Sequence, residues 1–186
     1  MKNSAIEQIL LHLYDSIDYG FSYNLKKRLY VDGFFPHNNW NFKPKEIKDS
    51  LATLKREKLI SQKKEYDGSI IVSLNEKGRL RALNIRFRRL GDNKKLSWDK
   101  KWRMVVFDIP NSRRKGRDAL RYRLKNAGFK EIQESIFVYP FDCEKEIRDF
   151  IALFKLEKYV RFALLDFIDG QENLIKSFKF TGFSLE

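Results

Sequence analysis

The stretch "MVVFDIP", residues 104–110, runs an apolar segment into an acid and then a proline, which makes Asp108 a candidate for chemistry. A carboxylate at the end of a buried strand can bind a hard cation such as Mg²⁺, and this cation can activate water for phosphodiester hydrolysis. The same carboxylate can instead accept backbone N–H groups in the turn that ends at Pro110. Both roles stay open from these residues, and Mg²⁺ is the one cofactor they suggest.

The charge of the chain points to a second kind of chemistry. The sequence has 186 residues with 38 Lys and Arg against 25 Asp and Glu, a net charge of +13, and its isoelectric point is about 9.7. Such a field attracts polyanions, and nucleic acid is the first partner to test. Residues 1–97 carry a net charge of +9 and residues 98–186 a net charge of +4. We therefore expect the nucleic-acid surface in the first half.

Several other kinds of site and partner are excluded by composition. Cys143 is the single cysteine and cannot form an intrachain disulfide, and with His12 and His37 it gives no ligand set for structural zinc. No apolar run approaches the roughly 18 residues of a membrane-spanning helix. The N-terminus lacks the pattern of a signal peptide. We expect a cytoplasmic protein with no membrane partner.

The first half begins with an amphipathic helix. Its apolar residues recur at helical spacing and share one face: Ile6, Ile9, Leu10, Leu13 and Ile17. A weaker helix is expected around Leu25 and Leu29, followed by the irregular aromatic loop "DGFFPHNNWNF".

A helix is predicted next, over residues 44–58, because Pro44 suits a first helical turn. Its apolar stripe is Ile47, Leu51 and Leu54, and the opposite face carries Lys45, Asp49, Ala52, Thr53 and Arg56. Two strand-like runs follow, joined at Asp67-Gly68, a strong hairpin signal. The stretch "NEKGRLRALNIRFRRL" then predicts a basic helix with the inner stripe Leu80, Leu83, Phe87 and Leu90.

The stretch "LATLKREKLISQKKEYDGSIIVSLNEKG" resembles the winged helix-turn-helix family in its order of elements. The resemblance implies a DNA-binding domain over residues 1–90. It places one set of residues, on the recognition helix, toward a major groove: Lys45, Lys48, Asp49, Thr53 and Arg56. It also places Lys63 and Lys64 on a wing that reaches phosphate or the minor groove. The alternative is that these charges only solvate a helix and a hairpin.

A short linker, "GDNKKLS" at 91–97, is expected between the halves because it lacks hydrophobic periodicity. Residues 98–186 then predict strands in "KWRMVVFDI", "FKEIQESIFVYP" and "KYVRFALLDFI" and helices in "SRRKGRDALRYRLKNAG" and "CEKEIRDFIALFKLE", with a short helix or strand in "QENLIKSFKF". Gly128 is placed to end the first of these helices. The order βαββαβ is that of a ferredoxin-like domain, so the expected fold class is α+β.

A second resemblance covers about eighty residues of this half. The stretches "FDIP", "SRRKGRDALRYRLKNAGF" and "IQESIFVYP" look like the small ferredoxin-like CRISPR-associated protein of spacer acquisition, with Asp108, Gln133, Ser135 and Phe137 at matching positions. That resemblance implies a homodimer in which two such acids meet near the axis and can share a divalent ion. Two close carboxylates repel each other unless a cation neutralises them.

The fusion of both domains resembles the PaaX-like transcriptional repressors. It implies a homodimeric regulator, most simply a repressor, that binds double-stranded DNA at an inverted repeat. PaaX-like repressors generally continue into a further C-terminal domain that this sequence does not show, so a small-molecule effector is doubtful. The alternative function is enzymatic: a Mg²⁺-dependent endonuclease acting on RNA or DNA, or a spacer-acquisition protein, with Asp108 as the catalytic and metal-binding residue. We favour the regulator over the enzyme.

Overall fold

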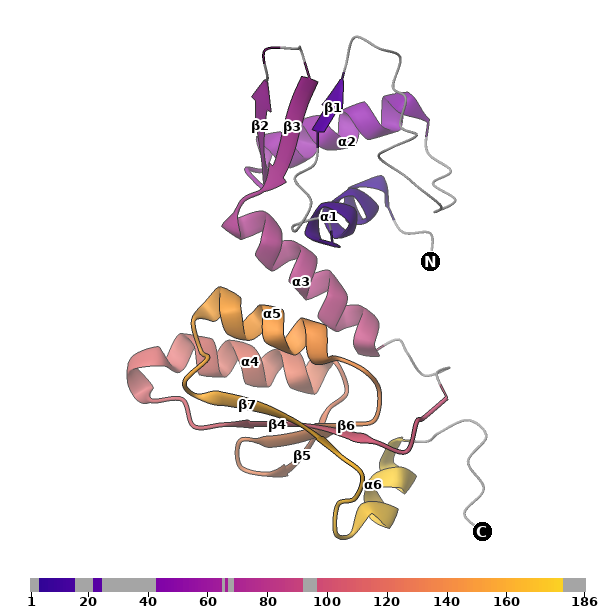
Figure 1. Cartoon of the computed structure of the whole chain (residues 1–186), viewed down its shortest axis with the longest axis vertical. Helices are drawn as coiled ribbons and strands as arrows, with labels where there is room; N and C mark the ends of the chain where they lie inside the picture. Colours follow the sequence, from indigo (N-terminus) through magenta and orange to yellow (C-terminus); the bar gives the residue numbers. More distant parts are fainter. Residues whose placement is uncertain are drawn as a thin grey trace. The chain divides into compact units, whose positions relative to one another are not determined.

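The computed structural model describes residues 4–15, 22–24, 43–64, 66, 69–91 and 97–178. The chain divides into two compact units, Met1–Ile85 and Arg86–Glu186, which we describe separately. The division falls inside helix α3 (Glu76–Gly91) (Figure 1). The helix ends at Gly91, one residue beyond the predicted end at Leu90 and inside the segment that the sequence placed in the linker. Residues 92–96 of that linker lie outside the described residues.

The first unit combines helices with a three-stranded antiparallel sheet. Its other elements are α1 (Ala5–Asp15), β1 (Ser22–Asn24), α2 (Pro44–Arg56), β2 (Ile60–Lys64) and β3 (Ser69–Leu74). The strand order is β1-β3-β2. Strand β1 was not predicted, because three residues are too few to show alternation. The weaker helix expected around Leu25 and Leu29, the aromatic loop and the Asp67-Gly68 turn lie outside the described residues.

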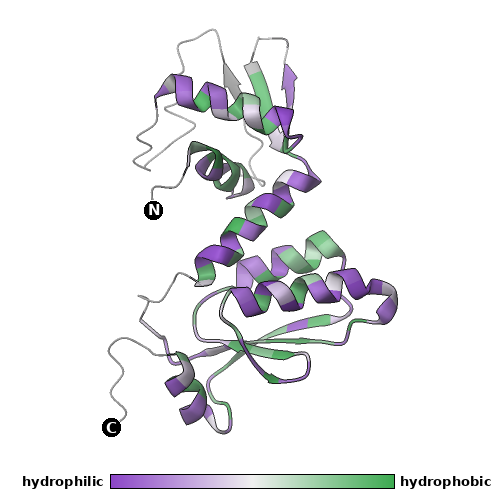
Figure 2. Ribbon diagram, turned by 180° about the vertical axis from the view of Figure 1, so that it is seen from behind, coloured by the Kyte–Doolittle hydropathy of each residue, from purple (hydrophilic) through white to green (hydrophobic). Residues whose placement is uncertain are grey.

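Helices α1 and α2 form the core of this unit with β3. The predicted inner stripe of α2 is buried as a whole: Ile47, Leu51 and Leu54. In α1 the buried residues are Ile9, Leu10, Leu11, Leu13 and Tyr14. Leu11 and Tyr14 were not in the predicted stripe; of the predicted residues, Ile6 is half-buried and Ile17 lies outside the described residues. Figure 2 shows hydrophobic residues along β3 and a mixture of both kinds along α2. An amphipathic helix of this sort buries one face and exposes the other.

A close joint connects the end of α2, the start of β2 and the start of α3. Lys58 follows α2 with a left-handed φ of 56°. The Asn75 side chain donates to the Lys58 carbonyl at 2.5 Å and accepts the Gly78 N–H at 3.0 Å. A Cβ atom at Gly78 would lie 2.0 Å from the Leu59 carbonyl oxygen. Only glycine allows this approach, which explains the Glu-Lys-Gly start of α3.

The second unit has the predicted βαββαβ order. Its elements are β4 (Trp102–Phe107), α4 (Arg114–Asn126), β5 (Lys130–Gln133), β6 (Ile136–Tyr139), α5 (Glu144–Phe154), β7 (Val160–Leu165) and α6 (Gln171–Phe178), with a 3₁₀ turn at Asn111–Arg113. The antiparallel sheet has the order β5-β6-β4-β7, and α4 and α5 cover one of its faces (Figure 1). The α+β fold class is confirmed, and the last predicted segment forms a helix.

The core of the second unit lies between this sheet and its helices. The largest fully buried side chains here include Trp102, Phe137 and Phe150. Gly128 follows α4 with φ +90°, as its predicted place as a helix end requires. The last turn of α3 belongs to this unit: the Tyr139 hydroxyl donates to the Leu90 carbonyl at 2.5 Å.

Candidate nucleic-acid interface and strand-end pocket

Helix α2 presents the predicted recognition face. Lys45, Lys48, Asp49 and Arg56 are exposed, and Thr53 is half-buried because it borders the inner stripe. Lys45, Lys48 and Arg56 form no ion pair with any residue that the structure describes. Their charges are therefore available to an incoming anion.

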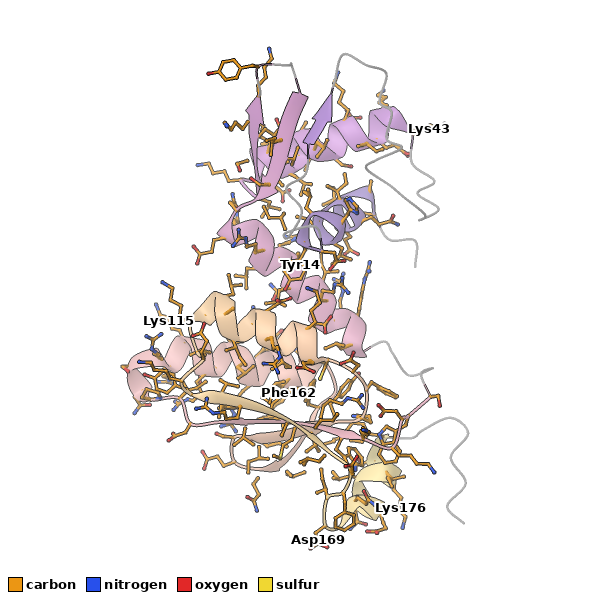
Figure 3. The ribbon with its side chains drawn as sticks, in the orientation of Figure 1. Tyr14, Lys43, Lys115, Phe162, Asp169 and Lys176 are labelled. Atoms are coloured by element: carbon orange, nitrogen blue, oxygen red, sulfur yellow. The ribbon has the colours of Figure 1, made fainter. Side chains whose placement is uncertain are left out.

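Local contacts fix both ends of α2. At its start, the Lys43 N–H donates to the Glu46 carboxylate at 2.7 Å, and Figure 3 labels Lys43 at this end of the helix. At its end, the Glu57 N–H donates to the Thr53 carbonyl at 2.9 Å. These bonds satisfy backbone groups that a helix terminus otherwise leaves without a partner. These bonds therefore fix where the helix that carries this face begins and ends.

Strands β2 and β3 form the hairpin that we call the wing. Lys63 pairs with Ile71 and Lys64 pairs with Ile70 in the antiparallel register. Both lysines are exposed, and β2 is an edge strand of the sheet. Tyr66, which follows them in the chain, is fully exposed. Tyr66 was not among the predicted site residues, although an aromatic residue beside a hairpin turn could have indicated it.

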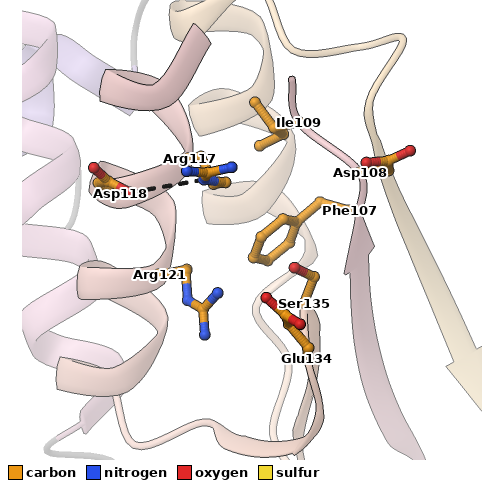
Figure 4. A pocket seen from close by; sticks show the side chains of 8 residues that line it. All are labelled: Phe107, Asp108, Ile109, Arg117, Asp118, Arg121, Glu134 and Ser135. Carbon is orange, nitrogen blue, oxygen red and sulfur yellow. Dashed lines mark ion pairs between the residues drawn. The ribbon is translucent and has the colours of Figure 1, made fainter. Parts of the chain in front are cut away.

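Asp108 lies at a different place, beside a cavity of about 580 Å³ at the end of β4. The cavity is lined by Phe107, Asp108, Ile109, Arg117, Asp118, Arg121, Glu134 and Ser135. Successive strand residues face opposite sides of a sheet, so Phe107 and Ile109 are buried while Asp108 is exposed. In Figure 4 the Asp108 carboxylate lies on the far side of the strand from Arg117 and Arg121.

The backbone at Asp108 is tied to the neighbouring strand. Its N–H donates to the Tyr159 carbonyl at 2.9 Å, while its carboxylate forms no hydrogen bond or ion pair within the described part of the chain. In these same ranges, no three His, Cys, Asp or Glu side chains gather in a way that could bind a metal ion. The structure thus places Asp108 at a cavity together with Ser135, another of the matching positions.

Four of the six basic residues of α4 are paired with acids. Arg114 and Arg117 contact Asp118 at 3.2 and 3.7 Å. Arg121 and Lys125 contact Glu131 on β5 at 2.5 and 2.9 Å. The hydrogen bond from Lys125, with Arg121 nearby, lowers the pKa of the Glu131 carboxyl. Two carboxylates, Asp118 and Glu131, thus offset part of the charge along this helix.

The other three matching positions lie in and beside the turn between β5 and β6: Gln133 ends β5, Ser135 is in the turn and Phe137 is in β6. Ser135 has a positive φ of 63°, and its carbonyl accepts the Phe107 N–H at 3.1 Å. Phe137 is fully buried, and its ring stacks on Phe107 with 5.8 Å between centroids. Gln133 is exposed. Ser135 and Phe137 therefore shape the end of β4, where Asp108 begins the next turn.

Cys143, at the start of α5, is fully buried. Burial raises the pKa of its thiol. A buried neutral thiol is a poor nucleophile, because the thiolate is the reactive form. The burial of Cys143 therefore indicates that this side chain packs in the core.

The second half of the chain is similar to a known domain family. Residues 95–175 match the family described as the PaaX protein central Cas2-like domain. This segment is therefore similar to the central Cas2-like domain of PaaX proteins. The match extends from just before β4 into α6, so it includes Asp108 and the strand-end cavity. It confirms the resemblance to PaaX-like proteins that the sequence motifs gave.

Other comparisons add less. No curated protein matches the sequence. Among solved structures, an uncharacterised protein, Rv0674 from Mycobacterium tuberculosis, is 17% identical with a TM-score of 0.35. The alignment covers 94% of this chain, which spans 66% of the length of that protein chain. Among the helices of the described ranges, none is long and apolar enough to cross a membrane.

Proposed function

We propose that the chain is a DNA-binding transcriptional regulator of the PaaX type, acting as a repressor. The observation that carries this proposal is the exposed face of α2, where Lys45, Lys48 and Arg56 have no ion-pair partner among the described residues. A lysine-bearing wing follows this helix in the same unit. The Cas2-like domain match supports the same protein family.

The residue types on α2 suit a major groove. Arg56 can donate two parallel hydrogen bonds to guanine, and Asp49 can accept one from the amino group of cytosine. Lys45 and Lys48 suit phosphate oxygens, which supply affinity but no sequence information. Lys63 and Lys64 on the wing suit phosphates or the adjacent minor groove.

We infer in addition that the second unit joins two copies of the chain. Strand β7 is an edge of the sheet, and the apolar Leu164 and Phe167 on or just after it are 52% and 63% exposed. An edge strand with exposed apolar side chains is a ready surface for a second copy. Two-fold symmetry in the protein would then require an inverted repeat in the operator.

Selection of duplexes from a random pool with the full chain tests both parts of this proposal. We expect enrichment of an inverted repeat, with two chains on each enriched duplex by sedimentation. A double variant, Lys45→Gln with Lys48→Gln, should weaken binding while its melting temperature stays unchanged. Failure to enrich any sequence, or equal affinity for single-stranded and duplex DNA, would argue against a sequence-reading regulator.

A further inference from the structure

The cavity at the end of β4 has walls of both charges, and the proposed DNA contacts do not use it. Arg117 and Arg121 are four residues apart on α4, so they lie on one face of that helix. Glu134 and Ser135 line the cavity from the turn between β5 and β6. Figure 4 shows the Arg121 guanidinium and the Glu134 carboxylate turned toward each other across it.

The two arginines keep hydrogen-bond donors for a ligand. Arg117 is 3.7 Å from Asp118, whose shorter contact, at 3.2 Å, is with Arg114. Arg121 uses Nη2 for Glu131, and a guanidinium has further N–H donors in the same plane. Each of these two side chains is only 30% exposed. Partial burial strengthens their interaction with an oxyanion relative to a fully exposed site.

Opposite the two arginines, the cavity has a hydrogen-bond acceptor that a ligand could use. The Glu134 carboxylate has no hydrogen bond or ion pair with any described residue. A simple anion in the cavity would meet repulsion from this group, and a simple cation would meet repulsion from the arginines. A DNA backbone, which carries only negative charge, fits this balanced site less well than it fits α2.

The volume of the cavity and its apolar lining residues also suit a small molecule. A volume of about 580 Å³ is within the range of roughly 300 to 1,000 Å³ typical of small-ligand sites. Phe107 and Ile109 are buried and line the cavity, so they offer apolar contact to a short carbon chain. A ligand with opposite charges at the two ends of such a chain would satisfy both walls.

We propose that this cavity binds a small zwitterion. Its phosphate or carboxylate group contacts Arg117 and Arg121, and its ammonium group contacts Glu134. This binding site goes beyond the proposed DNA-binding function, and the evidence for it does not depend on that function.

Calorimetric titration of the full chain with paired probes tests the zwitterion. O-phosphoethanolamine and propyl phosphate share a phosphoryl group, but only the first carries an ammonium group. We expect O-phosphoethanolamine to bind about tenfold more tightly, and the difference to vanish in Glu134→Gln. The pair 4-aminobutyrate and butyrate tests a carboxylate in the same way and shows which oxyanion is preferred. Equal binding within both pairs, or no binding of any probe at about 10 mM, would overturn the proposal.

A matched pair of variants on α4 tests the location. Arg117→Gln and Lys115→Gln each remove one positive charge from this helix, but exposed Lys115, labelled in Figure 3, does not line the cavity. We expect at least about tenfold weaker binding of the preferred probe for Arg117→Gln and less than about twofold for Lys115→Gln. Equal losses would show a diffuse field instead of a site.

Amide chemical shifts of the unmodified protein give a second readout that does not depend on the folding of a variant. We expect the preferred probe to shift the signals of Arg117, Arg121 and Ser135 most. Shifts concentrated on α2 or the wing would overturn the assignment to this cavity.

Discussion

Helices α2 and α4 are both 13 residues long and both rich in Lys and Arg, yet their charges are arranged differently. On α2, Lys45, Lys48 and Arg56 lack ion-pair partners within the described ranges. On α4, Arg114 and Arg121 pair with Asp118 and Glu131. The comparison shows that a basic run in a sequence does not by itself identify a nucleic-acid surface.

The different arrangement of charges on α2 and α4 affects ligand binding more than it affects folding stability. Exposed ion pairs contribute only about 0 to 1 kcal/mol to folding stability. They do, however, reduce the local positive field and hold guanidinium groups in fixed directions. The exposed cations of α2 therefore suit a polyanion. The paired arginines of α4 suit a smaller ligand, which their guanidinium groups can contact from fixed directions.

The largest expected effect is the dependence of DNA affinity on salt. If about six to ten phosphates are contacted, affinity should fall by roughly 10³ to 10⁵ between 50 and 200 mM salt. Each lysine on α2 that contacts phosphate contributes to this slope, so Lys48→Gln should reduce it by about 0.9. Fluorescence anisotropy at a series of salt concentrations measures it.

The matched control for this measurement is Arg114→Gln on α4. Arg114 is already paired with Asp118, so we expect no change in the salt slope. A slope that falls equally in both variants would remove the distinction between the two helices.

The next effect concerns the joint that holds the end of α2. Gly78→Ala should lower the free energy of unfolding by about 3 kcal/mol, because the new Cβ would meet the backbone of Leu59. The control is Gly170→Ala, where no atom lies within 4 Å of the added Cβ and φ is +71°. That change should cost about 1 kcal/mol from its left-handed backbone alone. Chemical denaturation compares them, and equal losses would contradict the tight joint.

A third test separates sequence reading from phosphate contact on the DNA side. Arg56→Ala should weaken the preferred duplex by about 1 to 3 kcal/mol and random duplex much less, because a bidentate base contact is lost. Lys64→Ala on the wing should weaken both duplexes alike, because phosphates are the same everywhere. Competition binding with both duplexes measures this. If the two variants behave identically on both, α2 is not the recognition helix.

Much of the fold could be predicted from the sequence, because the signals were local. The stripe Ile47, Leu51 and Leu54 predicted α2, and Gly128 predicted the end of α4. The three-residue β1 could not be predicted, because it forms only by pairing with the distant β3. The continuation of α3 through Gly91 was also missed, since glycine ordinarily signals a break.

The candidate sites were predictable in part. Residue spacing placed Lys45 and Arg56 on the outer face of α2, where the structure has them exposed. Spacing could not show that Glu131 of β5 neutralises Arg121, because that contact depends on tertiary packing. It also could not show that Glu134 faces α4 across a cavity. Such contacts depend on the order of strands in the sheet, which no single segment of the sequence reveals.

The smallest expected effect is at Asp108, the acid with which "MVVFDIP" ends its strand. Asp108→Asn should leave DNA affinity unchanged, because Asp108 is in the second unit and outside the proposed DNA contacts. With Mg²⁺ or Mn²⁺, we expect the unmodified protein to leave duplex DNA, single-stranded DNA and RNA intact, since one carboxylate per chain offers little coordination. The variant must be assayed in parallel, because a contaminating nuclease would cut in both samples. Metal-dependent cleavage that disappears in Asp108→Asn, with sedimentation unchanged, would show that this acid is catalytic. The functional site would then be the end of β4, and the protein would be a nuclease.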